Sequence, residues 1–430
     1  MNTLYNDEFM DNRKIYVHET DRLTGEVWCE GSKNATLMCM AAAALVDSYE
    51  EVVLTNVPNV SDVYVFSEIL RICGKEIKFH NGILSMSGKL KQSDIPEELT
   101  GSIRGASYCL GILISVLGKV QNLGLPGGDR IGNRPIDIHL ENLELMGVEY
   151  ECTGGKVNAI VKGKLKGATM YLRFPSVGAT CNIMLAAINA EGRTTILNAA
   201  KEPEILELAN ILIRMGAKIN GAGTDRIVID GGNQLSGNIT YEVSSDRIEM
   251  GSYIIAAAML GGNVKINKCI PYHNYPLLHI LKGIGVEVLY DDTSITISRR
   301  KKLKPLNVIA MPFPGIATDL QPLLAILALT IEGESSISDM VFPERFQYVF
   351  ELRKMGAEIE HIGYSIKVNG KRPLTGARVE GGDIRAVVAL VFAGLLAKGT
   401  TKISGISHLN RGYSKFLENM VALGANIEIL

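Results

Sequence analysis

One short pattern recurs six times along the 430-residue chain and constrains its fold more than any other feature. In each copy a helix-like segment ends at a glycine and a short alternating strand follows, as in residues 354–359 (Lys-Met-Gly-Ala-Glu-Ile). The six glycines, at spacings of 73, 69, 69, 71 and 68 residues, are Gly74, Gly147, Gly216, Gly285, Gly356 and Gly424. Units at such regular spacing predict a repeat architecture that covers almost the whole chain.

The chemistry of the pattern indicates what each unit contains. Glycine just past a helix adopts the left-handed conformation that ends it, and an alternating strand buries one face. A second strand follows an apolar helix upstream, as in residues 192–198, 262–267, 333–338 and 399–404. Each repeat is therefore predicted to contain a helix, a strand, a second helix and a second strand, with further strands in the remaining residues. This order predicts an α/β protein.

The two helices of a unit differ in pattern. One kind is apolar almost all round, which is typical of a helix buried on every side. These helices are expected at residues 41–46, 108–117, 183–190, 254–260, 323–331 and 387–397. The other kind is amphipathic, as in Glu204–Met215, and is expected to lie outside. Three buried helices would make one domain, so we predict two: residues 1–33 plus 244–430, and residues 34–243.

Composition excludes several classes of function. A net charge of −2 argues against a nucleic-acid binder that works by bulk charge. The apolar runs are shorter than the ~18 residues of a membrane span, and residues 1–27 lack the apolar core of a signal peptide. The seven cysteines form no CxxC pair and are expected to be reduced core thiols. We therefore expect a cytoplasmic protein without membrane insertion, metal or cofactor.

Charged and polar residues precede the buried helices. They are Lys33–Asn34, Arg104–Gly105, Gly178–Thr180, Asp246–Arg247, Thr318–Asp319 and Asp383–Arg385. Helix N-termini offer free N–H groups and partial positive charge, and added Lys or Arg favours phosphate and carboxylate. Thr318 and Gln321 also fit a capping box. Any one of these residues could merely cap a helix, but their equivalent positions favour a cleft that binds a ligand with several negative groups.

The glycine-rich segment around 125–135 contains three glycines, two prolines and two arginines. Such a segment can be a mobile loop that folds over a ligand on glycine hinges. An ordinary surface loop is an equally good interpretation of this segment alone.

Ordered motifs carry a close resemblance to a known family. They are residues 31–35 (Gly-Ser-Lys-Asn-Ala), 125–128 (Leu-Pro-Gly-Gly), 131–139 (Ile-Gly-Asn-Arg-Pro-Ile-Asp-Ile-His), 174–180 (Phe-Pro-Ser-Val-Gly-Ala-Thr), 223–227, 246–249, 318–321 and 411–413 (Arg-Gly-Tyr). From about Gly25 to Leu430 the chain resembles the UDP-N-acetylglucosamine enolpyruvyl transferases of the EPSP synthase superfamily. The resemblance implies a two-domain inside-out α/β barrel of six units.

The resemblance also implies a reaction. The enolpyruvyl group of phosphoenolpyruvate would pass to the 3-hydroxyl of UDP-N-acetylglucosamine through a tetrahedral intermediate, with loss of phosphate, as the first committed step of peptidoglycan synthesis. This chemistry needs an acid near the methylene carbon and a base near the hydroxyl. It also needs a water-poor site and cations around the departing phosphate.

The implied site residues fall into three groups. Lys33, Arg104, Arg134, Arg385 and Arg411 would hold the phosphate and carboxylate of phosphoenolpyruvate, with Arg345 close by. Asn34 and Asp319 would contact the acceptor sugar, and Val341 and Asp383 would also bind substrate. The uridine diphosphate would be cradled by Pro135, Ile136, Asp137, Ile138, His139, Ser176, Val177 and Gly178. The implied catalytic set is Asp129 as acid, Asp319 as base, Lys33 and Arg411.

The sequence departs from the family pattern at three places. Many members carry Cys where Asp129 stands, and a carboxyl group is a poorer target than a thiolate for the epoxide fosfomycin, so we expect insensitivity to it. The neighbouring Arg130 would oppose the acid role if it paired with Asp129. Ile316–Ala317 and Pro343–Glu344 replace the usual residues near the sugar pocket.

Two alternatives follow from these departures. The first is a paralogous enolpyruvyl transferase that acts on another uridine nucleotide or nucleotide sugar; a shikimate-phosphate enzyme shares the fold but fits segments 135–139 and 176–178 less well. The second is a non-catalytic UDP-sugar sensor, against which the retention of Lys33, Asp129, Asp319 and Arg411 argues. The sequence leaves the oligomeric state open.

Overall fold

The computed structural model describes residues 14–129, 131–132 and 134–429. The chain divides into two compact units, each with its own hydrophobic core. Unit 1 comprises Met1–Glu30, Asp129–Asn133 and Ser245–Leu430, and unit 2 comprises Gly31–Gly128 and Arg134–Ser244. Asp129 and residues 131–132 of the glycine-rich segment thus group with unit 1, while the described residues on either side of the segment group with unit 2.

The described part of unit 2 contains three sheets. Their strands, in order across each sheet, are β13 (Ile239–Glu242), β3 (Ser48–Thr55), β5 (Ile83–Gly88) and β4 (Glu76–His80); β11 (Lys218–Asn220), β12 (Arg226–Asp230), β10 (Arg193–Leu197) and β9 (Thr169–Tyr171); and β6 (Lys119–Gly124), β8 (Lys156–Val161) and β7 (Val148–Thr153).

Three further sheets lie in the described part of unit 1. Their strands are β21 (Arg378–Glu380), β22 (Thr400–Ser404), β1 (Ile15–His18) and β23 (Ile427–Ile429); β15 (Glu287–Tyr290), β16 (Ser294–Arg299), β14 (Gly262–Asn267) and β2 (Leu23–Trp28); and β17 (Asn307–Ala310), β18 (Gly333–Asp339), β20 (Ser365–Gly370) and β19 (Ile359–Ile362). The first sheet joins strands from near both chain ends, because β1 pairs antiparallel with β22 and β23.

The six sheets share one topology. In the four-stranded sheets one parallel pair is followed by two antiparallel pairs, as in β9–β10, β10–β12 and β12–β11. The sheet of β6, β8 and β7 has only the antiparallel pairs, but a parallel bridge between Asp94 and Gln121 stands where the fourth strand would pair. The recurrence predicted from the glycine spacing is therefore present in the hydrogen bonding.

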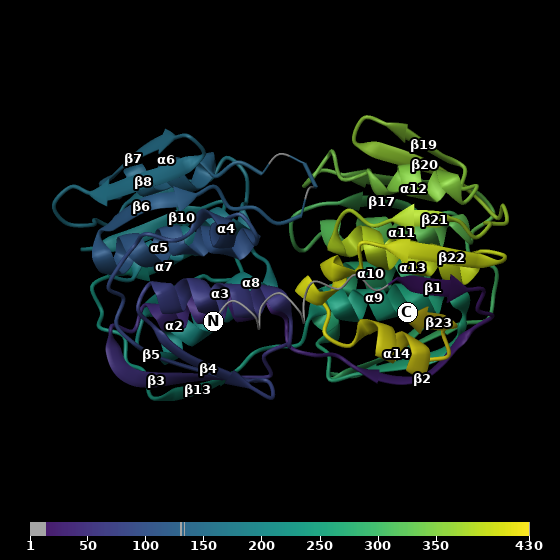
Figure 1. Ribbon diagram of the computed structural model, residues 1–430, viewed down its shortest axis with the longest axis horizontal. Helices are drawn as coiled ribbons and strands as arrows, with labels where there is room; N and C mark the ends of the chain where they lie inside the picture. Colours follow the sequence, from purple (N-terminus) through teal and green to yellow (C-terminus); the bar gives the residue numbers. More distant parts are fainter. Residues whose placement is uncertain (1–13, 130, 133, 430) are drawn as a thin grey trace. The chain divides into compact units, whose positions relative to one another are not determined.

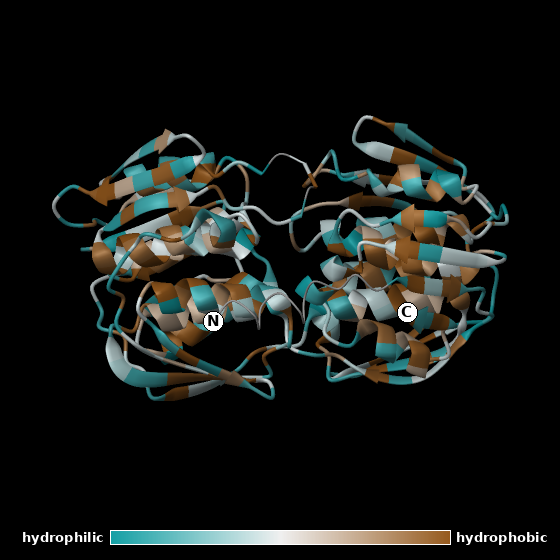
Figure 2. Ribbon diagram, in the orientation of Figure 1, coloured by the Kyte–Doolittle hydropathy of each residue, from teal (hydrophilic) through white to brown (hydrophobic). Residues whose placement is uncertain are grey.

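The apolar helices form the centre of each unit. They are α2 (Lys33–Ala44), α5 (Tyr108–Leu117) and α7 (Val177–Ala187) in unit 2, and α9 (Arg247–Leu260), α11 (Gln321–Leu329) and α13 (Ile384–Leu396) in unit 1. Within unit 2 these helices lie between the sheet containing β8 and the sheet containing β3 (Figure 1). Figure 2 shows hydrophobic colour along them and alternating colours along the strands. Their burial confirms the sequence prediction.

A second set of helices leads into the predicted glycines. They are α3 (Ser61–Ile72), α6 (Asp137–Glu144), α8 (Pro203–Arg214), α10 (Tyr275–Ile284), α12 (Tyr348–Lys354) and α14 (Phe416–Ala422). The glycines after them have φ between +88° and +116°, which confirms the left-handed helix ends. Shorter helical turns are α4 (Glu97–Thr100), η1 (Arg104–Ser107), η2 (Pro271–Asn274), η3 (Thr318–Leu320) and η4 (Ile406–Arg411).

Two sequence predictions about helices have different outcomes. The amphipathic helix α8 buries one face and exposes the other, at Leu206, Asn210, Ile213 and Arg214, as expected of an outer helix. Buried Glu207 accepts a hydrogen bond from the backbone of Ser244 at 2.9 Å, which gives this polar residue an internal role. The capping box is wrong: Thr318 donates to Asp339 at 2.6 Å, and the Gln321 amide donates to the Tyr348 hydroxyl.

The cysteines and the membrane prediction can be compared with the structure directly. All seven cysteines are free, and six are buried, as expected; Cys152 on β7 is exposed. No helix in the described ranges is long and apolar enough to cross a membrane.

Candidate active site

In unit 1 a buried arginine holds the carboxylate of Asp319. Asp319 lies on η3, the turn that leads into α11, and its side chain is 26% exposed. Arg345 is only 3% exposed and donates through Nη1 to Asp319 Oδ1 at 2.7 Å. The same nitrogen donates to the Thr318 hydroxyl at 3.2 Å. The carboxylate at this helix start is therefore fixed in direction while one side of it stays accessible.

A second arginine, Arg385, also pairs with the Asp319 carboxylate. Arg385, in the first turn of α13, places Nη2 at 3.6 Å from Asp319 Oδ2 and its guanidinium over the Tyr413 ring at 5.0 Å. Burial alone would lower the pKa of Arg385, but Tyr413 and Asp319 outweigh it and raise the pKa above its usual range. Asp383 caps α13 by accepting from the backbone of Arg385 and Ala386. Arg345 and Arg385 are thus permanent cations held by carboxylates.

Asp129 forms an ion pair with Arg411. Arg411 Nη1 lies 2.5 Å from Asp129 Oδ1, and the two side chains are 17% and 13% exposed. The residues are 282 positions apart, and Arg411 ends η4. The two residues that the family resemblance marks as catalytic in this region are therefore in direct contact. The postulated interaction with Arg130 lies outside the described residues.

Unit 2 gathers basic residues under different electrostatic conditions. Lys33, the first residue of α2, lies 3.4 Å from the buried Asp62 of α3. Arg104 opens η1 and donates to the Pro126 carbonyl oxygen at 3.4 Å. Burial, and then the like charge of Arg134, lower the pKa of Arg104 to about 10. A negatively charged ligand near these two arginines would relieve both unfavourable effects.

The segments proposed to cradle the nucleotide meet at two helix starts in unit 2. Ser176 caps α7, accepting from the backbone of Ala179 at 3.3 Å. Asp137 opens α6 and pairs with Arg173. His139 in the same turn is 2% exposed, and its ring lies against Gly178, because a Cβ there would come within 2.9 Å of His139 Cε1. The two sequence segments are therefore neighbours in the fold.

The remaining expected site residues occupy varied surroundings. Ile136 is buried, Pro135 is exposed, and Ile138 and Val177 are partly buried. Asn34 lies in the first turn of α2. The backbone of Val341 donates to Asp339 at 2.9 Å. These positions add backbone and apolar surface rather than charge.

Sequence reasoning missed three polar residues that hold the expected ones. Asp62 pairs with Lys33, Asp339 holds Thr318 and the backbone of Val341, and Asn182 contacts His139 at 2.8 Å. Asn182 had a signal in the sequence, because it is a lone amide in an otherwise apolar helix. The other two have no local signature.

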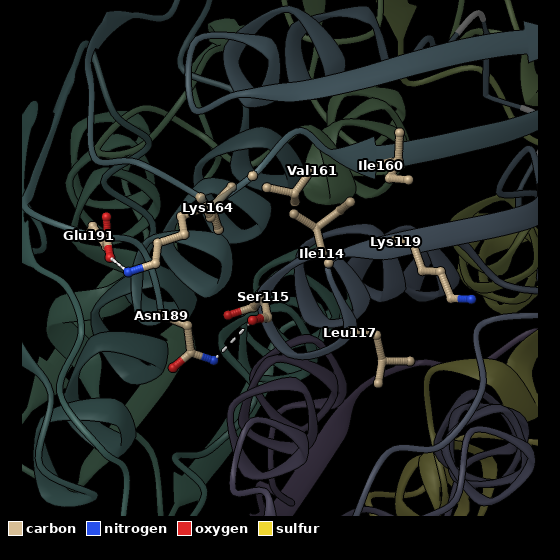
Figure 3. A pocket seen from close by; sticks show the side chains of 12 residues that line it. Ile114, Ser115, Leu117, Lys119, Ile160, Val161, Lys164, Asn189 and Glu191 are labelled. Atoms are coloured by element: carbon tan, nitrogen blue, oxygen red, sulfur yellow. Dashed lines mark hydrogen bonds and ion pairs between the residues drawn. The ribbon is translucent and has the colours of Figure 1, made fainter.

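A separate hollow of about 530 Å³ lies in unit 2, lined at the carboxyl end of α5 and along β8. Figure 3 shows Lys164 reaching Glu191 and Asn189 donating to the Ser115 backbone at its edge. None of the expected site residues lines it. The ends of α5 and α7 that carry the charged and capping residues are the better candidates for chemistry.

Comparison with known proteins places the chain in a family. Residues 17–420 match the family model described as EPSP synthase (3-phosphoshikimate 1-carboxyvinyltransferase). A curated relative, UDP-N-acetylglucosamine 1-carboxyvinyltransferase 2 of Carboxydothermus hydrogenoformans, is 42% identical over 418 residues, 96% of this chain and 99% of the relative.

Solved structures agree with this placement. The enolpyruvyl transferase NikO from Streptomyces tendae is similar with a TM-score of 0.87 and 26% identity, over 97% of this chain and 99% of that one. EPSP synthase from Acinetobacter baumannii, at 22% identity and a TM-score of 0.75 over 97% of this chain and 100% of that one, shares the fold. The chain therefore belongs to the EPSP synthase family of enolpyruvyl (carboxyvinyl) transferases.

Proposed function

We propose that this protein transfers the enolpyruvyl group of phosphoenolpyruvate to the 3-hydroxyl of UDP-N-acetylglucosamine and releases phosphate. The observation that carries the proposal is the Asp319 carboxylate, held by Arg345 and Arg385 at a helix start. The relative that is 42% identical is named UDP-N-acetylglucosamine 1-carboxyvinyltransferase 2, which supports the transferred group and the acceptor.

Asp319 is the proposed base. A carboxylate that is held by two arginines keeps one orientation, and its partial exposure leaves it open to a substrate hydroxyl. General base catalysis requires the proton to lie within hydrogen-bond reach of the base. Arg345 and Arg385 would then stabilise the carboxylate before the proton transfer and the departing anion after it.

Asp129 is the proposed acid toward the methylene carbon. Asp129 is paired with Arg411, and Arg411 would exchange this partner for an anionic group of phosphoenolpyruvate when that substrate binds. Lys33, Arg104 and Arg134 would hold the remaining negative charge of that substrate. Binding of phosphoenolpyruvate would thereby release the Asp129 carboxyl group from Arg411, so that Asp129 can act as the acid.

The nucleotide would bind along Pro135–His139 and Ser176–Gly178, with Asn34, Val341 and Asp383 beside the sugar. Backbone N–H groups at the start of α7 suit phosphate oxygens. Uridine and the sugar would then direct the 3-hydroxyl toward Asp319.

The finer fold and cellular assignments are part of the same proposal. Each unit would be an inside-out α/β barrel, supported by its buried helices and surrounding sheets, with domains at residues 1–33 plus 244–430 and 34–243. In the cytoplasm the reaction would open peptidoglycan synthesis, and it would thereby serve cell-wall biogenesis, cell shape and division.

The test is phosphate release from phosphoenolpyruvate by the purified protein with UDP-N-acetylglucosamine, UDP-glucose, UMP or shikimate 3-phosphate as acceptor. We expect release with UDP-N-acetylglucosamine only, and loss of it in Asp319→Ala and Asp129→Ala. Release with UMP or UDP-glucose instead would identify a paralogue with another acceptor. Tight binding of the UDP-sugar without any release would contradict catalysis.

A further inference from the structure

Asn182 is a fully buried amide in the middle of α7, and its side chain contacts three groups of unit 2. Its Oδ1 accepts from the backbone N–H of Gly111 on α5 at 2.7 Å. Its Nδ2 lies 2.8 Å from His139 Nδ1 and donates to the Gly178 carbonyl oxygen at 3.3 Å. One side chain thus connects α5, α6 and the first turn of α7.

The orientation of the Asn182 amide is fixed by Gly111. A backbone N–H can only donate, so the amide atom that faces it must be the oxygen. The two helices are in close contact here, because a Cβ on Gly111 would lie 2.6 Å from the Asn182 backbone oxygen. A flipped amide would set its NH₂ group against the Gly111 N–H and leave both donors buried without an acceptor.

The amide orientation determines the tautomer of His139. An NH₂ group only donates, so Nδ1 of His139 must be the acceptor and carries no proton. Burial, followed by the charge of Arg104, lowers the pKa of His139 to about 3. The ring is therefore neutral near neutral pH, and its single proton is on Nε2.

The protonated edge of the ring faces the start of α7. A Cβ on Gly178 would lie 3.1 Å from Nε2, so glycine is needed for the ring to lie there. His139 is 2% exposed, and Asn182 contacts its other ring nitrogen, Nδ1. The N–H groups of Val177 and Gly178, in the same turn, lack intrahelical acceptors. The Nε2–H group and two backbone donors therefore lie together at one helix start.

We infer that Asn182 is a positioning residue that holds His139 in the Nε2–H tautomer, so that the ring donates a hydrogen bond to a diphosphate oxygen of the nucleotide. Diphosphate oxygens only accept hydrogen bonds, which suits a set of donors. The hydrogen bond to the nucleotide rests on the proposed function. The tautomer of His139 is inferred independently of that function. His139 in this role binds substrate and transfers no proton.

The tautomer is tested without any ligand. In protein labelled with ¹⁵N-histidine, long-range ¹⁵N–¹H correlation at neutral pH should show His139 with Nε2 protonated and Nδ1 unprotonated; the signal is assigned by its loss in His139→Gln. In Asn182→Asp a carboxylate faces both Gly111 and the ring, so Nδ1 should become protonated. A protonated Nδ1 in the wild type, or an unprotonated Nδ1 in Asn182→Asp, would overturn the inference.

The role in binding is tested with UDP and uridine as probes. His139→Leu removes the donor and should weaken UDP binding by roughly 10-fold, while His139→Gln, whose amide can donate from the Nε2 position, should retain most of the affinity. Uridine should bind all variants alike, and His279→Gln on the exposed face of α10 is the matched control. Equal UDP affinity in Leu and Gln variants would overturn the role. Failure of UDP to bind the wild type would contradict the proposed function itself, whatever the tautomer.

Discussion

Two buried arginines, Arg345 in unit 1 and Arg104 in unit 2, lie in opposite electrostatic surroundings. In unit 1 buried arginines are matched by carboxylates, and the pKa of Arg345 is raised because Asp319 and Asp383 outweigh the effect of burial. In unit 2 the pKa of Arg104 is lowered by burial and by Arg134. Arg345 is therefore already paired with carboxylates, whereas Arg104 would gain most from an arriving anion. We expect Arg345 to contribute fixed orientation and Arg104 to contribute affinity for an anion.

The largest effect should come from the carboxylate at the centre of unit 1. Asp319→Asn keeps the shape but removes the proposed base, so we expect kcat to fall by roughly 10³-fold in a phosphate-release assay. Asp292→Asn, at an exposed position of the same unit, is the control. A fall of less than tenfold in the Asp319 variant would remove Asp319 from the chemistry and leave it a structural partner of Arg345.

The next test compares the unfolding free energies of two variants, Arg345→Ala in unit 1 and Arg104→Ala in unit 2. Arg345→Ala leaves Asp319 and Asp383 near each other without their buried partner, which should cost about 3–5 kcal/mol of unfolding free energy. Arg104→Ala removes a repelled cation and should change the unfolding free energy by less than about 1 kcal/mol while raising the KM for phosphoenolpyruvate. Urea unfolding and steady-state kinetics separate the two outcomes. Equal destabilisation by both variants would contradict the proposed difference between Arg345 and Arg104.

A buried acid in unit 1 gives a pH-dependent prediction. Burial, together with the charges of Asp246 and Glu30, raises the pKa of Glu249 from 4.5 to about 8. The folded state then holds a proton that the unfolded state releases, so stability is full below about pH 4.5 and decreases as pH rises toward about 8. Between these pH values Glu249 should lower the unfolding free energy by on the order of 1 kcal/mol per pH unit.

Glu249→Gln isolates that contribution. The amide can still accept from the Glu30 backbone and can donate to the Tyr253 hydroxyl, which are the partners of the native side chain. Urea unfolding at pH 5 and pH 8 should therefore show a smaller loss of stability with pH in the variant than in the wild type. Identical slopes would show that Glu249 is ionised in the folded protein.

The last prediction is that the epoxide fosfomycin has no effect on the activity of the wild-type protein. Fosfomycin should leave the wild-type activity unchanged, because Asp129 offers a carboxylate in place of a thiolate. Asp129→Cys should make the enzyme sensitive to the epoxide if Asp129 occupies the position of the usual loop cysteine. Residual activity after preincubation measures both. Inactivation of the wild type would mean that another residue is alkylated.

Most of the fold could be predicted because its signals are local. Gly216 ends a helix by its own conformation, and an apolar run such as 387–397 indicates burial whatever surrounds it. Pairings between distant residues carry no such signal. Asp62 beside Lys33 and Asp339 beneath Thr318 became visible only in the structure. The failed capping box at Thr318 has the same cause, because a distant carboxylate took the hydroxyl that a local rule assigned to the helix.

The central claim is the identity of the transferred group and its acceptor. The most direct measurement is NMR of the product formed from ¹³C-labelled phosphoenolpyruvate and UDP-N-acetylglucosamine by the wild-type protein. The account predicts a labelled carboxyvinyl ether on the 3-oxygen of the sugar, with one phosphate released per ether formed. Labelled pyruvate with phosphate, or no conversion while both substrates bind, would contradict it.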